Sequence, residues 1–195
     1  MLAGVNLNNF CAMYQRLSRS LYFVDKTGIL GQLIPLFSTN MNYICVTQPR
    51  RFGKTSIAQM LSAYLCITDD TGDIFKHLAV AKQAFFKEHL NKHNIVYMDL
   101  SRLPDNCDSY RKFKDMLVGQ LENDLKRLYP SVFNGEYSRI SKNISIWDIF
   151  FAINLEKGES FVFIIDEWDA LFQADFLTEK DKQDYLTFLK CLLKF

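Results

Sequence analysis

Apolar and polar residues alternate along the chain in blocks that predict strands and helices in turn. Three apolar runs lack the polar alternation of a half-exposed strand and predict buried strands over 43–47, 95–100 and 161–165. Elsewhere, apolar residues recur every three to four positions, which predicts helices over 56–66, 110–128, 146–155 and 180–193. Strands separated by helices favour a three-layer α/β sandwich with a largely parallel sheet.

The first 40 residues predict a lead-in of helical and extended segments that packs on this core. Residues 1–20 have helical spacing, with Phe10 and Tyr14 on the apolar face. A short extended run over 21–24 precedes a predicted helix over 28–37. We therefore expect a lead-in over 1–40 and a core domain over 41–195.

The loop after the first predicted strand ends in Gly53-Lys54-Thr55 and leads into a predicted helix. A strand, a loop of this kind and a helix form the layout of a phosphate-binding P-loop, because backbone N–H groups and the helix dipole then favour an anion. Lys54 would add a cation for the β- and γ-phosphates, and Thr55 a hydroxyl for Mg²⁺. The predicted nucleotide contacts are Gln48, Pro49, Arg50, Arg51, Phe52, Gly53, Lys54, Thr55 and Ser56.

The loop departs from the usual GxxxxGK[ST] pattern at its first position, where Gln48 replaces glycine. The backbone at Gln48 can follow the loop if its φ is negative. Pro49 stiffens the loop and removes one N–H donor. A surface turn with an accidental Gly-Lys-Thr is the alternative to a P-loop.

The strand predicted over 161–165 ends in two carboxylates, Asp166 and Glu167. This is the Walker B pattern of P-loop ATPases, in which the first acid would hold the Mg²⁺ shell and the second would accept a proton from water or orient it. A strand that merely ends in a polar turn is the alternative. The two motifs, in this order on separate strands, predict binding of ATP with Mg²⁺.

Composition narrows the classes of protein without identifying one. The 195 residues carry a net charge of +1, so strong direct binding of nucleic acid by bulk charge is not expected. No apolar run has the length of a membrane span, and residues 1–11 lack a signal-peptide pattern. The five cysteines are odd in number and lack CxxC spacing, which argues against disulfides or zinc and favours a cytoplasmic location.

Four segments of the chain resemble the predicted AAA-ATPase-like family, whose members often carry a restriction-endonuclease-like nuclease domain. The family patterns are YVDKT, RPRRFGKS, an apolar strand ending in Asp, and IDEYD; the matching segments here are 22–27, 49–55, 95–100 and 164–169. The resemblance runs from about Phe10 to Asp169, and the family itself lacks the first P-loop glycine. Gln48 and Trp168 are small departures, where the family tends to have Arg and Tyr.

The resemblance implies a fold of P-loop NTPase type and roles for individual residues. Lys54 and Thr55 would contact phosphate and Mg²⁺, Asp166 would be a second metal ligand, and Glu167 and Lys54 would be catalytic. The segment 25–27 lies where related ATPases place their adenine-side segment; a helix N-cap is the alternative. Arg50 and Arg51 would touch phosphate or a partner chain, unless they lie in a solvated loop.

In this family a sensor strand and a helical lid follow Walker B, whereas this chain stops at Phe195. We therefore expect a truncated chain and an incomplete sheet. Two functions follow: a Mg²⁺-dependent ATPase that couples hydrolysis to conformational change, or a non-hydrolysing nucleotide-binding or interaction module that truncation has inactivated. Expected partners, besides nucleotide, are a second copy of the chain or a fused or partner nuclease-like domain. A nucleic-acid-acting protein is a weaker third alternative.

Overall fold

The computed structural model describes residues 2–6, 10–49, 51–134 and 145–193. Its contacts divide the chain into two compact units. The sheet unit comprises Met1–Val5 and Val96–Phe195, and the helical unit comprises Asn6–Ile95. The division into a lead-in over 1–40 and a core domain over 41–195 remains a prediction.

The sheet has three strands, β1 (Ala3–Val5), β2 (Asn94–Asp99) and β3 (Phe161–Asp166), in the order β1-β2-β3. β1 runs antiparallel to β2, with Gly4 opposite Tyr97, whereas β2 and β3 are parallel. The apolar runs therefore predict the positions of β2 and β3 correctly, and β2 is buried as expected, whereas β3 is only partly buried. The small mixed sheet corrects the expectation of a largely parallel one, because its first strand comes from the N-terminus.

Backbone N–H groups of the N-terminal segment that includes β1 are held by a helix rather than by a further strand. Gln120 Oε1 accepts hydrogen bonds from the N–H groups of Leu2 and Ala3, at 2.8 and 3.0 Å. Asp124 Oδ2 accepts one from the N–H of Val5, at 3.0 Å. Side chains of a helix thus satisfy the N–H donors in and next to β1. A strand of three residues would not be stable from its local sequence alone.

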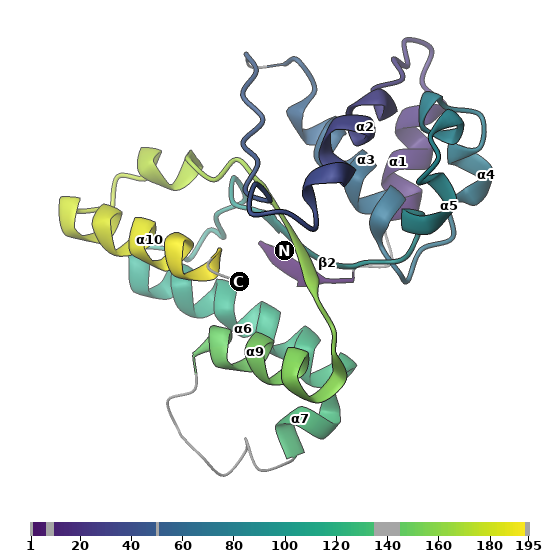
Figure 1. Ribbon diagram of the computed structural model, residues 1–195. Coiled ribbons are helices and arrows are strands. Elements are labelled where there is room, and N and C mark those ends of the chain that lie inside the picture. Colours follow the sequence, from purple (N-terminus) through teal and green to yellow (C-terminus); the bar gives the residue numbers. More distant parts are fainter. Residues whose placement is uncertain (1, 7–9, 50, 135–144, 194–195) are drawn as a thin grey trace. The chain divides into compact units, whose positions relative to one another are not determined.

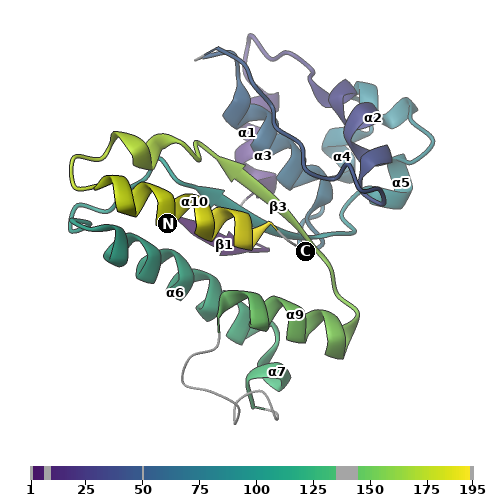
Figure 2. The ribbon, with the colours of Figure 1, turned by 60° about the vertical axis from the view of Figure 1, so that its left-hand side comes forward.

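The helices of the sheet unit follow the predicted spacing closely (Figures 1 and 2). They are α6 (Tyr110–Leu128), α7 (Pro130–Asn134), α9 (Ile146–Lys157), the 3-10 helix η4 (Ala170–Gln173) and α10 (Glu179–Leu192). α6 contacts β1, α7 and α9. The three predicted helices of this unit are therefore confirmed, with ends that differ by two residues at most.

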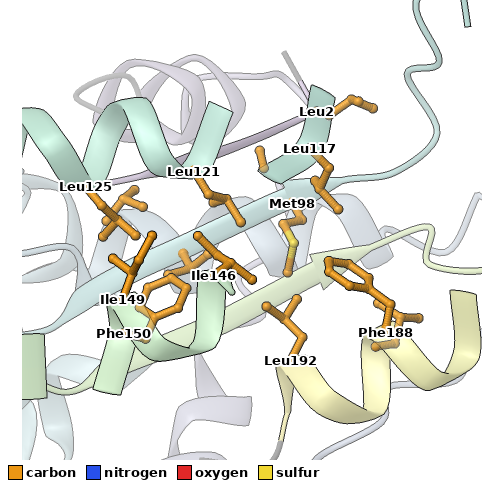
Figure 3. Packing of buried hydrophobic residues seen from close by; sticks show 14 of the residues in the cluster. Leu2, Met98, Leu117, Leu121, Leu125, Ile146, Ile149, Phe150, Phe188 and Leu192 are labelled. Carbon is orange, nitrogen blue, oxygen red and sulfur yellow. The ribbon is translucent and has the colours of Figure 1, made fainter. Parts of the chain in front are cut away.

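Residues spaced four apart on α6 form the centre of the core of this unit. Leu117, Leu121 and Leu125 are fully buried. Figure 3 shows their side chains pointing toward those of α9 and α10, with Met98 of β2 among them. Burial of such apolar side chains contributes roughly 1.5–3 kcal/mol each, which makes this cluster the main support of β2 and β3.

The helical unit consists of short helices around α1 (Phe10–Ser18) and α3 (Lys54–Leu65), which pack against each other (Figure 1). The remaining helices are η1 (Thr27–Ile29), α2 (Leu30–Leu33), η2 (Ile34–Leu36), α4 (Gly72–Phe75), η3 (Ala79–Lys82) and α5 (Phe86–His89). Phe75 stacks on Tyr14 of α1 at 5.1 Å between ring centroids and meets Tyr64 of α3 at 5.2 Å. These rings join the two long helices to α4.

Two predictions for the first 40 residues are wrong in part. The N-terminal 20 residues are not helical throughout, because β1 precedes α1. The helix predicted over 28–37 is divided into η1, α2 and η2, and Pro35 lies in η2, where its ring and missing N–H disfavour a continuous α-helix.

The segment 43–47, predicted to be a buried strand, is neither a strand nor buried. Tyr43 and Ile44 are 59% and 42% exposed. A strand needs a neighbour for its backbone N–H and C=O groups. No described segment pairs with this one, so its apolar sequence does not produce a strand.

Candidate functional site

The loop predicted to bind phosphate opens directly into α3. Gly53 is the N-cap residue, with φ 83° and ψ 33°, a left-handed conformation that glycine adopts without steric cost. Because glycine has no side chain to cap the helix and the first turn of α3 has no acidic residue, the helix N-terminus favours an anion. Lys54 is half-buried and Thr55 is exposed at this end.

Two lysines contact this loop from different parts of the sequence. Lys54 Nζ donates a hydrogen bond to the carbonyl oxygen of Gln48 at 3.0 Å. Lys26 Nζ donates one to the carbonyl oxygen of Phe52 at 2.5 Å. Lys26 was not among the residues predicted to contact phosphate, because it lies 26 positions before Phe52. Its place inside the Asp25-Lys26-Thr27 motif is the one sequence signal that could have indicated that Lys26 belongs to the candidate site.

The side chains on either side of Lys26 fix its position. Asp25 Oδ1 accepts hydrogen bonds from the N–H and hydroxyl of Thr27, at 2.8 and 2.7 Å. Asp25 Oδ2 accepts one from the N–H of Ala79 at 2.7 Å, and Thr27 Oγ1 accepts one from Val80 at 3.1 Å. The bonds to Ala79 and Val80 join η1 to η3. The N-cap residue of η1 is Lys26, and no side chain makes a capping hydrogen bond there, so the structure does not show the cap that the N-cap alternative expects.

The Asp25 carboxylate is therefore held in its ionised form. Partial burial would raise the pKa of Asp25, but the hydrogen bonds from Thr27 and Ala79 outweigh it and lower the pKa below its usual value.

Asp166 is the last residue of β3, and only 6% of its surface is exposed. Its carbonyl oxygen accepts a hydrogen bond from the N–H of Leu100 at 3.1 Å, which ties the end of β3 to the residue after β2. Glu167 follows it and is exposed. A partly buried strand thus ends in one buried carboxylate, Asp166, and the next one, Glu167, is exposed to solvent.

A third acid, Asp99, ends the neighbouring strand β2 and was not named as a site residue from the sequence. Its Oδ2 lies 2.7 Å from Nε of Arg102, and its Oδ1 accepts a hydrogen bond from the hydroxyl of Ser101 at 2.6 Å. Burial raises the pKa of Tyr97 in β2, and the charges of Asp166 and Asp99 raise it further. The parallel strands β2 and β3 therefore both end in an acid whose negative charge raises the pKa of Tyr97.

Two predicted site residues other than glycine have left-handed backbone conformations. The φ of Arg51 is 68° and the φ of Glu167 is 51°. Such positions cost of order 1–3 kcal/mol and gather at functional sites. Two hydrogen bonds hold the turn after Glu167. The carbonyl oxygen of Glu167 accepts one from the N–H of Ala170 at 3.0 Å, and the Tyr185 hydroxyl donates one to the carbonyl oxygen of Trp168 at 2.6 Å.

The described candidates form two groups. The helical unit holds Gln48, Pro49, Phe52, Gly53, Lys54, Thr55 and Ser56 with Arg51 and Lys26, and the sheet unit holds Asp166, Glu167 and Asp99. Arg50 lies outside the described residues. In the described part of the chain, no three His, Cys, Asp or Glu side chains are grouped as a metal site.

The α/β architecture and the loop at the start of α3 are consistent with part of a P-loop fold. The chain belongs to the family described as predicted AAA-ATPases, whose family model matches residues 6–195. This confirms the resemblance of the four sequence segments. No curated protein and no solved structure shows a significant match to the chain.

None of the helices in the described part of the chain combines the length and the apolar character that a membrane span requires.

Proposed function

We propose that the chain binds ATP with Mg²⁺ at residues 48–56 and hydrolyses it, and that hydrolysis changes the conformation of this chain or of a partner. The observation that carries the proposal is the start of α3. There, a left-handed Gly53, a helix N-terminus without acidic residues and the ammonium group of Lys54 come together. Membership of a family of predicted AAA-ATPases supports the choice of nucleotide.

The ammonium group of Lys54 bonds to the carbonyl oxygen of Gln48 in its own loop. An ammonium group has three donors, so the same lysine can keep this contact and donate to the β- and γ-phosphates. The exposed Thr55 hydroxyl offers an oxygen donor, and Asp166 offers a carboxylate. These are the donor types that Mg²⁺ takes from protein beside phosphates and water, so the residues fit the ion.

When bound, Mg²⁺ would neutralise charge on the β- and γ-phosphate oxygens. Glu167 would accept a proton from the attacking water or orient it. Its exposure and its left-handed backbone both fit a side chain that meets substrate rather than one that stabilises the fold. A cytoplasmic location, and a second copy of the chain or a nuclease-like domain as partner, remain predictions.

Phosphate release at saturating ATP and Mg²⁺ tests the proposal. Glu167→Gln removes the base and keeps the size of the side chain, so it should lower kcat by at least about 100-fold while ATP still binds. Glu156→Gln, at an exposed position of α9, is the matched control and should keep wild-type turnover. Equal phosphate release by wild type and Glu167→Gln would contradict the catalytic assignment.

A nucleotide-binding module without hydrolysis is the second candidate. It is favoured by the exposed segment 43–47, since no described strand anchors the start of the phosphate loop. In that case the wild-type chain would bind ATP but release no phosphate above the level of Glu167→Gln.

A further inference from the structure

Lys26 approaches the phosphate loop closely enough to shape it. Its Nζ donates to the Phe52 carbonyl at 2.5 Å, and a Cβ atom added to Gly53 would lie 2.7 Å from the same nitrogen. The absence of a side chain at Gly53 therefore leaves the space in which this ammonium group lies. Phe52 and Gly53 directly precede α3, so a second cation lies where the helix N-terminus opens.

Neither of the two lysines that contact the loop is neutralised within the described part of the chain. Every ion pair there joins other residues, and neither Lys26 nor Lys54 has a carboxylate partner. Asp25 is adjacent to Lys26 in sequence, but its two oxygens accept hydrogen bonds from Thr27 and Ala79. Two unneutralised ammonium groups that both contact this loop carry like charge, and a bound polyanion would offset the repulsion between them.

The loop also lacks features that P-loops usually provide. Gln48 replaces the first glycine, and Pro49 has no N–H to offer. A lysine that approaches from another segment can replace a missing backbone donor. The Phe52 carbonyl uses one of the three N–H bonds of the Lys26 ammonium group, so the other two can be offered to phosphate.

From these observations we propose that Lys26 is a second phosphate-binding lysine, which acts with Lys54 on the terminal phosphates of a nucleoside triphosphate. This inference rests on the proposed function of the same loop. Asp25 and Thr27 are positioning residues, because their bonds to η3 hold the backbone on both sides of Lys26. The Asp25-Lys26-Thr27 motif thereby serves the phosphate side of the nucleotide.

The test measures equilibrium binding of ATP and of AMP by the full chain with Mg²⁺. Lys26→Met should weaken ATP binding about ten-fold or more, the usual effect of losing a charge-assisted hydrogen bond, and should leave AMP binding unchanged. Lys26→Arg keeps a cation and should weaken ATP binding less. Lys87→Met, at an exposed position of α5, is the control for loss of a lysine.

A labelling experiment on the wild-type chain does not depend on any variant. ATP with Mg²⁺ should protect Lys26, but not Lys87, from acetylation by an amine-reactive ester, as followed by mass spectrometry. Equal labelling of Lys26 with and without ATP would count against a phosphate contact.

The results separate this inference from the function on which it rests. If Lys54→Ala abolishes ATP binding while Lys26→Met binds ATP as wild type does, the P-loop stands and the role of Lys26 is overturned. A loss of ATP and AMP affinity to the same extent would mean that Lys26 only supports the fold, which also overturns it. If the wild-type chain does not bind ATP at all, the proposed function itself fails.

Discussion

The imidazole rings of His89 and His93 form a paired contact in the helical unit. Nδ1 of His89 and Nε2 of His93 are 2.9 Å apart, and the ring planes differ by 7°. One nitrogen donates and the other accepts, so a single shared proton satisfies both. Phe37 packs edge-on against both rings, and Glu88 lies 3.9 Å from Nε2 of His89. Protonation of both rings would remove the acceptor nitrogen and place two like charges beside an aromatic ring.

This pair predicts a loss of stability in mild acid. Burial lowers the pKa of His93, and the charge of His89 lowers it further. Below pH 6.5, the ordinary pKa of histidine, His93 binds a proton in the unfolded chain, whereas in the folded chain it binds that proton only at lower pH. The free energy of unfolding therefore falls as pH falls through this window.

His93→Gln should reduce that pH dependence between about pH 7 and pH 5, as measured by urea unfolding at several pH values. His77→Gln, at an exposed position of the same unit, is the control for the loss of an imidazole. If wild type and His93→Gln lose stability in parallel over this range, the pair is not the acid-sensitive element.

At the scale of residues, the sequence predicts those parts of the candidate site that are local. Gly53 and Lys54 lie next to each other where α3 begins, so their pattern alone indicates an anion site. Lys26 and Asp99 could not be assigned in this way. Lys26 reaches the loop through folding of a distant segment, and the place of Asp99 depends on the pairing of β2 with β3.

At the scale of elements, two helices of the sheet unit begin with reciprocal caps. In α10, Thr178 Oγ1 accepts a hydrogen bond from the N–H of Asp181 at 3.2 Å, and Asp181 Oδ2 accepts one from the N–H of Thr178 at 3.0 Å. The hydrogen bonds from Thr178 lower the pKa of Asp181 below its usual value. Ser145 and Asp148 form the same capping box at the start of α9.

Thr178→Ala should lower the free energy of unfolding by about 1 kcal/mol, since it removes this cap. Thr187→Ala, at an exposed position inside α10, is the matched control. Alanine favours a helix interior, so this control should be neutral or slightly stabilising. Urea unfolding of both variants measures the difference, and equal stability would show that the cap does not contribute.

The same scale explains which elements the sequence predicts. The span of α6 is recovered to the residue, because Ser109 caps it and leucines spaced four apart mark its buried face. β1 is missed because three residues carry no periodic signal and depend on partners in β2 and α6. The segment 43–47 is wrongly predicted, because an apolar run does not by itself supply a pairing partner.

At the scale of the whole molecule, β2 connects two units of different construction. Its first two residues belong to the helical unit and its last four to the sheet unit. No change in composition and no Pro- or Gly-rich linker marks this boundary in the sequence. The N-terminal strand β1 also joins the second half of the chain, which is a non-local contact that local patterns do not encode.

Equilibrium binding of a fluorescent ATP analogue with Mg²⁺ tests the central claim most directly. The titration compares the wild-type chain with Lys54→Ala, and Lys87→Ala serves as the charge-matched control. We predict saturable binding by wild type and by the control, and none that can be measured for Lys54→Ala. Folded wild-type protein that does not bind the analogue, or a Lys54→Ala variant that binds it as tightly as wild type, would contradict the account.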